Sequence, residues 1–226
     1  MGCERIPCSL GLKTEIMNKK LLLHSCCGPC STAVIEKLLQ DGNYDITVFY
    51  FNPNITERAE YEHRKAEQKR AIAELYPGLG FIEGNYDPRE YYEVISGYES
   101  EPEGGFRCSL CFTLRLEETA RYAKEHGYVC FDTTLTVSPY KSFDTIYAIA
   151  KQLENKYKVE YLGGNYKKKD GYKRSIELSK QIDLYRQHFC GCEYSKATSA
   201  AMSKGLIENN IWKQKRCGQP FAMKKV

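Results

Sequence analysis

Seven of the eleven cysteines in this 226-residue chain lie in three short groups: Cys26-Cys27-Gly-Pro-Cys30, Cys108-Ser-Leu-Cys111 and Cys190-Gly-Cys192. Two thiols separated by two residues can hold one metal ion or one corner of an iron–sulfur cluster within a single turn of chain. Zinc and an iron–sulfur cluster fit this spacing equally well. Because either centre needs about four thiolates, the chain has thiols left for a second task.

The group Cys190-Gly-Cys192 is suited to redox chemistry rather than to a structural disulfide. A bridge between thiols this close would be strained, and strained disulfides are more easily reduced. The pair is therefore either a two-electron dithiol or half of a second metal site. Cys30 is the natural extra ligand if a second metal is bound.

The other cysteines, Cys3, Cys8, Cys130 and Cys217, show no spacing that indicates chemistry. Cys130 lies in an apolar run and is expected to pack in the core as a small hydrophobic residue. An odd number of cysteines and a first segment without an apolar signal region argue against a secreted disulfide scaffold. We therefore expect a reduced, cytoplasmic protein, and no apolar run approaches the roughly 20 residues that a membrane span needs.

Apolar runs alternate with amphipathic segments along most of the chain. Runs at residues 20–24, 46–51, 81–82, 128–134 and 159–162 predict strands, and the segments between them predict helices. This order predicts an α/β fold, with a mostly parallel sheet flanked by helices and a helical C-terminal part. We expect one α/β metalloenzyme domain at residues 19–205, between a flexible leader (1–18) and a basic tail (206–226). Ligands of such sheets bind beyond the carboxyl ends of the strands, which is where the first cysteine group follows the first strand.

The net charge of +4 is compatible with an RNA partner but does not require one. The basic segment at residues 166–174 fits a solvated loop and a phosphate-contacting loop equally well.

Six strings, in this order along residues 20–200, resemble the cobalamin-independent epoxyqueuosine reductases of the QueH type. They are His24-Ser-Cys-Cys-Gly-Pro-Cys30, Phe51-Asn-Pro-Asn-Ile55 with Glu60-Tyr-Glu-His-Arg64, Arg107-Cys-Ser-Leu-Cys-Phe112, Thr133-Thr-Leu-Thr-Val-Ser-Pro-Tyr-Lys141, Asp170-Gly-Tyr-Lys-Arg-Ser175 and Tyr185-Arg-Gln-His-Phe-Cys-Gly-Cys192. The resemblance implies a fold like that of the nucleotide α-hydrolase, or PP-loop, group. It implies a [4Fe-4S] cluster without cobalamin, and reduction of epoxyqueuosine in tRNA to queuosine with electrons from an external donor.

The resemblance also implies roles for particular residues. Cys26, Cys27, Cys108 and Cys111 are expected to ligate the cluster, with Cys30 as an alternative to Cys27 or as a second-site ligand. Cys190 and Cys192 are expected to be a redox-active pair or to ligate one additional iron. The residues expected to contact the substrate are Arg64, Arg107, Tyr140, Lys141, Lys173 and Arg174.

The chain departs from the family pattern at Asn165-Tyr166-Lys167, where an Asp-Phe-Arg-like string is expected. A carboxylate that could bind metal is therefore missing there. The proton donor is not identified by any motif: Asp132, His188 and Tyr140 are candidates, whereas His24 is expected to be a core residue.

Two other functions are compatible with the same cysteines. One is a PP-loop-like, cluster-dependent tRNA thiolase, although no glycine-rich phosphate loop follows the first strand. The other is a zinc-stapled RNA-binding module, which the surplus of thiols disfavours.

Overall fold

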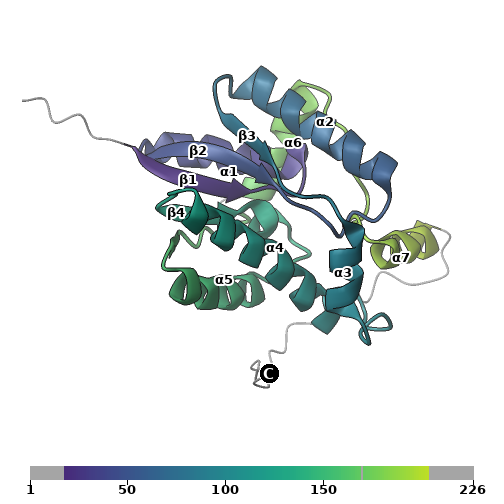
Figure 1. The fold of residues 1–226 in the computed structure, drawn as a ribbon. Coiled ribbons are helices and arrows are strands. Elements are labelled where there is room, and N and C mark those ends of the chain that lie inside the picture. Colours follow the sequence, from purple (N-terminus) through teal and green to yellow (C-terminus); the bar gives the residue numbers. More distant parts are fainter. Residues whose placement is uncertain (1–17, 169, 204–226) are drawn as a thin grey trace, which may run out of the picture.

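The computed structural model describes residues 18–168 and 170–203, and its centre is a five-stranded sheet (Figure 1). All strand pairs are parallel, in the order β3-β2-β1-β4-β5. The strands are β1 (Lys19–His24), β2 (Tyr44–Tyr50), β3 (Gly80–Glu83), β4 (Cys130–Thr133) and β5 (Glu160–Tyr161). Nearly all of the expected leader and the whole expected basic tail lie outside the described residues, so the domain boundaries stay a prediction.

Helices cover both faces of the sheet (Figure 1). Helix α1 packs against α2 and α6, and α4 packs against α5 and β1. The helical segments are α1 (Gly28–Asp41), α2 (Arg58–Leu75), α3 (Pro88–Ile95), α4 (Phe106–Glu125), the 3-10 helix η1 (Thr134–Val137), α5 (Phe143–Tyr157), α6 (Gly171–Gln181) and α7 (Glu193–Ser203).

Alternate residues of the central strand divide the core into two layers. Leu21 and Leu23 pack with Val34 of α1 on one face, and Leu22 packs with Leu116 of α4 on the other. These three leucines of β1 are fully buried, as expected for a central strand of a parallel sheet with helices on both faces. Cys130 is fully buried in the first of these layers, so its predicted core role is confirmed.

The start of α1 differs from the sequence expectation. Gly-Pro pairs usually mark turns, but Gly28 and Pro29 form the first turn of α1, with Cys27 as the N-cap residue. Proline is well accommodated there because the first helical N–H groups have no partner within the helix. A side chain at Gly28 would meet the carbonyl oxygen of Glu67 at 2.9 Å, so α1 can approach α2 this closely only with glycine.

The N-cap of α2 is Glu57. No helix in the described part of the chain has both the length and the apolar character required to cross a membrane.

Candidate metal centre

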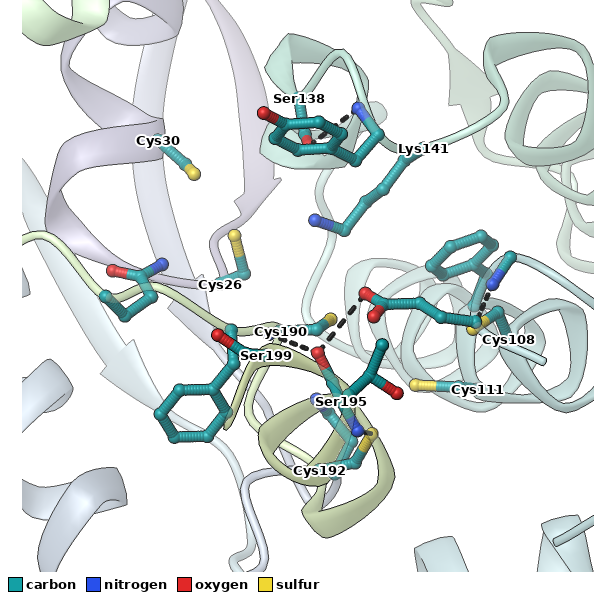
Figure 2. A pocket seen from close by; sticks show the side chains of 18 of the residues that line it. Cys26, Cys30, Cys108, Cys111, Ser138, Lys141, Cys190, Cys192, Ser195 and Ser199 are labelled. Atoms are coloured by element: carbon teal, nitrogen blue, oxygen red, sulfur yellow. Dashed lines mark hydrogen bonds between the residues drawn. The ribbon is translucent and has the colours of Figure 1, made fainter. Parts of the chain in front are cut away.

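A cavity of about 300 Å³ opens near the carboxyl ends of the strands. Its walls come from the start of α1, the first turns of α4, the segment after η1, and residues 186–202. Six cysteine side chains line it, as Figure 2 shows: Cys26, Cys30, Cys108, Cys111, Cys190 and Cys192.

The first cysteine group forms a compact set of three thiols at the N-terminus of α1. The sulfur atoms of Cys26, Cys27 and Cys30 lie within 4.8 Å of one another, and those of the adjacent pair are 3.8 Å apart. Cys30 was expected as an alternative to Cys27, but in the structure both of these thiols lie close to Cys26. The amide groups and dipole of the helix N-terminus favour thiolates at this position. We call Cys26, Cys27 and Cys30 the three-thiol group.

Hydrogen bonds within the three-thiol group distribute its protons unevenly. Hydrogen bonds from Cys27 and Cys30 hold the pKa of Cys26 well below its usual range. The hydrogen bond between Cys27 and Cys26 raises the pKa of Cys27 to about 12. From outside the group, the side-chain amide of Gln187 donates to Cys27 Sγ at 2.8 Å. Metal binding requires thiolates, and Cys26 is the thiol of this group whose pKa is shifted toward the charged form.

The other four thiols that line the cavity come from α4 and from the loop before α7. Cys108 and Cys111 lie in the first turns of α4, and Cys111 packs with Cys192 against Tyr91. Burial, together with the charge of Cys190, raises the pKa of Cys108 to about 11. In the view of Figure 2, Cys190 projects toward the space between Cys26 and Cys111. We call Cys108, Cys111, Cys190 and Cys192 the four-thiol group.

The structure therefore divides the expected cluster ligands Cys26, Cys27, Cys108 and Cys111 between two groups. Among the residues that the structure describes, only the three-thiol group has all of its sulfur atoms within 4.8 Å. The four-thiol group is more open, and two of its sulfurs accept backbone N–H bonds: Cys108 from Gly104 at 3.1 Å and Cys192 from Ser195 at 3.4 Å.

The loop that carries Cys190 and Cys192 is fixed by a buried arginine. Arg64 donates to the carbonyl oxygens of Cys190 at 3.0 Å and Phe189 at 3.3 Å, and to Glu60 Oε1 at 2.6 Å. Gly191 has φ +128°, and a side chain on it would meet Arg64 Nη1 at 3.2 Å. The middle position of this motif therefore needs glycine for both its backbone conformation and its close packing.

Arg115 is a second buried arginine, and it lies on the same face of α4 as the two cysteines of that helix. Positions 108, 111 and 115 follow the i, i+3, i+7 spacing of a single helix face. The side chain is 1% exposed, its Nη2 donates to Asn52 Oδ1 at 2.7 Å, and its Nε and Nη1 have no hydrogen-bond partner. A buried charge without compensation costs several kcal/mol, so this guanidinium requires an anionic neighbour.

Cysteine thiols supply the negative charge that acts on Arg115. Burial lowers the pKa of its guanidinium, but the charges of Cys111, Cys26 and Cys190 outweigh this effect and raise the pKa above its ordinary value. These thiols come from all three cysteine segments of the sequence. The six thiols that line the cavity, with Cys27 and a buried cation close by, therefore fit an anionic metal–thiolate centre.

Lys141 extends into the cavity between the two thiol groups, as Figure 2 shows. Burial lowers its pKa, but the charges of Cys190, Cys26 and Cys30 outweigh that effect and raise it above the usual value. The side chain is therefore an ammonium group at neutral pH. Its neighbour Tyr140 also lines the cavity and is 58% exposed.

The other four residues expected to contact substrate are not among the described residues that line the cavity. Arg64 and Arg107 are 1% and 3% exposed, and Arg107 donates to the carbonyl oxygens of Glu99 and Glu101. Neither buried guanidinium is placed to contact a phosphate. Arg174 pairs with Glu36 at 2.8 Å, and Lys173 is exposed on α6. Sequence reasoning missed Arg115 and Gln187, although the spacing of Arg115 from Cys108 and Cys111 was a signal for it.

Asp132 is buried at the end of β4 and accepts three hydrogen bonds, from Tyr166 Oη at 2.6 Å and from two backbone N–H groups. Burial raises its pKa to about 7. Tyr166, which lies where the family pattern departs, therefore fixes a buried carboxyl group instead of supplying a metal ligand.

His24 is a core residue, as expected. Its Nδ1 lies 2.8 Å from Thr133 Oγ1 and its Nε2 lies 3.3 Å from the Phe51 carbonyl oxygen. Because a carbonyl only accepts, Nε2 carries the proton and Nδ1 accepts from the threonine hydroxyl. Burial lowers the pKa of His24 to about 3.

This burial predicts an acid-dependent loss of stability. A histidine whose folded pKa lies below its unfolded value of about 6.5 supports folding above pH 6.5, and this support is lost as the pH falls toward 3. Between pH 7.5 and pH 5, we expect His24 to account for about 2 kcal/mol of lost unfolding free energy. Urea unfolding of the reduced, metal-free protein and of His24→Gln at both pH values measures this. Equal losses in the two proteins would contradict the assignment.

The parallel five-stranded sheet, with helices on both faces and a cysteine-lined cavity at its carboxyl edge, defines an α/β protein whose clustered thiols could hold a metal. A predicted subunit of a tRNA methyltransferase from Methanocaldococcus jannaschii has a similar fold, with a TM-score of 0.50 at 12% identity over 83% of this chain and 88% of that one. The family model "Epoxyqueuosine reductase QueH" matches residues 21–198, and the chain belongs to this family.

Two curated relatives with that description illustrate the similarity. The one from Streptococcus pyogenes serotype M1 is 40% identical over 185 residues, which cover 80% of this chain and 72% of the relative. The one from Haemophilus influenzae is 37% identical over 210 residues, or 92% and 80% of the two chains. The chain is accordingly an oxidoreductase that converts epoxyqueuosine in tRNA to queuosine.

Proposed function

We propose that the reductase holds two metal sites in one cavity. The three-thiol group ligates a [4Fe-4S] cluster, and the four-thiol group ligates a single additional iron. The observation that carries this proposal is that three of the seven thiols form a compact set, while the other four lie outside that set and line the same cavity as Cys26 and Cys30. Three thiolates can hold three corners of a cluster, and four suit a tetrahedral single-ion site.

Removal of the epoxide oxygen fixes the electron and proton balance. Two C–O bonds break, an alkene forms, and two electrons and two protons convert the oxygen to water. When bound, the metal centre supplies the electrons, which it receives singly from an external donor. The protein must therefore place the epoxide carbons at the thiol-lined wall and hold a hydrogen-bond donor against the oxygen.

Lys141 is the residue that we assign to the oxygen. Its ammonium group extends into the cavity between the two thiol groups, where it can donate a hydrogen bond to the oxygen as negative charge develops. Exposed Tyr140 provides an aromatic surface for the modified base. Lys173, which is exposed within the basic segment, is assigned to the tRNA backbone, where a lysine acts as a point charge.

Replacing Lys141 by Met is expected to lower kcat by roughly 100-fold, because loss of one preorganised donor to a developing oxyanion typically costs this much. Lys173→Met serves as the matched control, since it removes a lysine that does not line the cavity. It should raise KM for tRNA with kcat preserved. Steady-state conversion of epoxyqueuosine-tRNA under a chemical reductant measures both variants. A Lys141→Met enzyme with unchanged kcat would refute the assignment.

The two-site proposal is tested by the iron, acid-labile sulfide and zinc content of anaerobically purified protein. It requires about five irons and four sulfides per chain, together with conversion of epoxyqueuosine-tRNA. About four irons with four sulfides would instead favour Cys190 and Cys192 as a redox-active dithiol. Zinc without sulfide would exclude the cluster.

A further inference from the structure

We propose that Arg115 is the counter-cation of the metal centre, and that it sets the reduction potential of the centre by stabilising its more negative, reduced form. This inference rests on the two-site proposal above. It assigns a positioning and electrostatic role to a residue outside the ligand set.

The first observation is that no carboxylate pairs with Arg115 in the described part of the chain. Arg64, by contrast, pairs with Glu60, and Arg107 donates to two backbone carbonyl oxygens and lies 4.4 Å from the ring of Tyr194. Arg115 has one neutral amide partner, Asn52, and two of its nitrogen atoms, Nε and Nη1, have no hydrogen-bond partner among the described residues.

The second observation is the position of Arg115 among the thiols. It follows Cys111 by one turn on the same face of α4. Its partner Asn52 also donates to the carbonyl oxygen of Ser25, the residue before Cys26, at 2.9 Å. The guanidinium is therefore connected to the segment of Cys26 through Asn52 and to Cys111 through α4. The cation is thus held rigidly beside the position where the metal-bound sulfurs must lie.

Two consequences follow from this geometry. Adding an electron makes a metal–thiolate centre more negative, so a fixed buried cation favours the reduced state. Without metal, the guanidinium has one neutral amide partner and two unpaired nitrogen atoms among the described residues, and a buried charge without compensation costs several kcal/mol. The same residue should therefore stabilise the metal-loaded protein and destabilise the metal-free one.

A residue with a merely structural role would stabilise the metal-loaded and the metal-free protein alike. Opposite effects of Arg115 on the stability of these two forms therefore distinguish the proposal from such a role. The informative variants of the full chain are Arg115→Leu, which removes the charge, and Arg115→Lys, which keeps it. Arg121→Gln is the matched control, because Arg121 lies on the same helix but is exposed and paired with Glu118 and Glu125.

The first measurement is denaturant unfolding of the chelated, reduced proteins at pH 7. Arg115→Leu should unfold at a higher denaturant concentration than the unaltered protein, and Arg121→Gln at about the same concentration. An Arg115→Leu protein that unfolds earlier, or does not fold, would overturn the proposal, because a structural arginine predicts that result.

The second measurement is a potentiometric titration of the iron-loaded proteins, followed by electron paramagnetic resonance. At a fixed solution potential, the ratio of reduced to oxidised metal centre in Arg115→Leu should be at least tenfold lower than in the unaltered protein. For a one-electron couple, this corresponds to a midpoint potential about 59 mV more negative. Arg115→Lys should recover part of the shift, and Arg121→Gln should show none. Iron uptake by Arg115→Lys but not by Arg115→Leu would also support the role of the charge, whereas equal midpoints would overturn it.

The two-site proposal and the role of Arg115 are contradicted by different results. If the unaltered protein contains zinc and no sulfide, the two-site proposal fails, while the unfolding comparison still decides whether Arg115 carries an uncompensated charge.

Discussion

Replacing Cys192 by Ser is expected to abolish the reduction of epoxyqueuosine while leaving the visible absorbance of the cluster in place. Cys192 belongs to the four-thiol group and not to the three thiols assigned to the cluster. Loss of an outer-shell partner of a metal site alone costs about 10- to 100-fold, so loss of a direct ligand should lower turnover by more than about 100-fold. The iron content should fall from about five to about four per chain.

The matched control for this variant is Cys130→Ala, which removes a buried thiol that lies outside both groups. It should cost some stability by leaving a small cavity, but the iron content and kcat should be retained. Iron analysis, the visible spectrum and single-turnover conversion of epoxyqueuosine-tRNA give the three readouts. Full activity of Cys192→Ser would remove the four-thiol group from the reaction.

Replacing Cys30 by Ser is expected to have the opposite spectroscopic effect. With one of only three protein ligands lost, the cluster should not be retained, and iron should fall from about five to about one per chain. The absorbance near 400 nm should disappear with it, and so should turnover. The single iron of the four-thiol group should remain measurable.

This variant also distinguishes two ligand assignments. The sequence pattern favoured Cys26, Cys27, Cys108 and Cys111, whereas the structure places Cys30 with the first two and the α4 pair elsewhere. Under the first assignment, Cys108→Ser loses the cluster and Cys30→Ser keeps it. The two-site proposal predicts the reverse outcome.

Much of the fold is predictable from the sequence because strongly apolar runs identify its central elements. The segment after Lys20 is expected as a buried strand, and β1 is indeed the fully buried centre of the sheet. Local boundaries were less predictable where tertiary contacts decide them. Gly28 begins α1 at a place where this helix packs so closely against Glu67 of α2 that there is no room for a side chain. No local pattern in the sequence shows that contact.

The candidate site was only partly predictable for the same reason. Cysteine spacing identifies which thiols carry chemistry, but their grouping depends on where the loop around Cys190 is held. Arg64 holds that loop from α2, more than 120 positions earlier in the chain. The family resemblance implied that Arg64 contacts the substrate. A sequence alone does not distinguish an arginine that donates to backbone carbonyl oxygens from one that faces solvent.

Anomalous X-ray diffraction at the iron absorption edge, on crystals of the anaerobically purified protein, tests the central claim most directly. The account predicts two separate iron features in the cavity. One is a multi-iron peak against Cys26, Cys27 and Cys30, and the other is a single-ion peak among Cys108, Cys111, Cys190 and Cys192. One multi-iron peak bridging Cys26, Cys27, Cys108 and Cys111, with no iron beside Cys190 and Cys192, would contradict it.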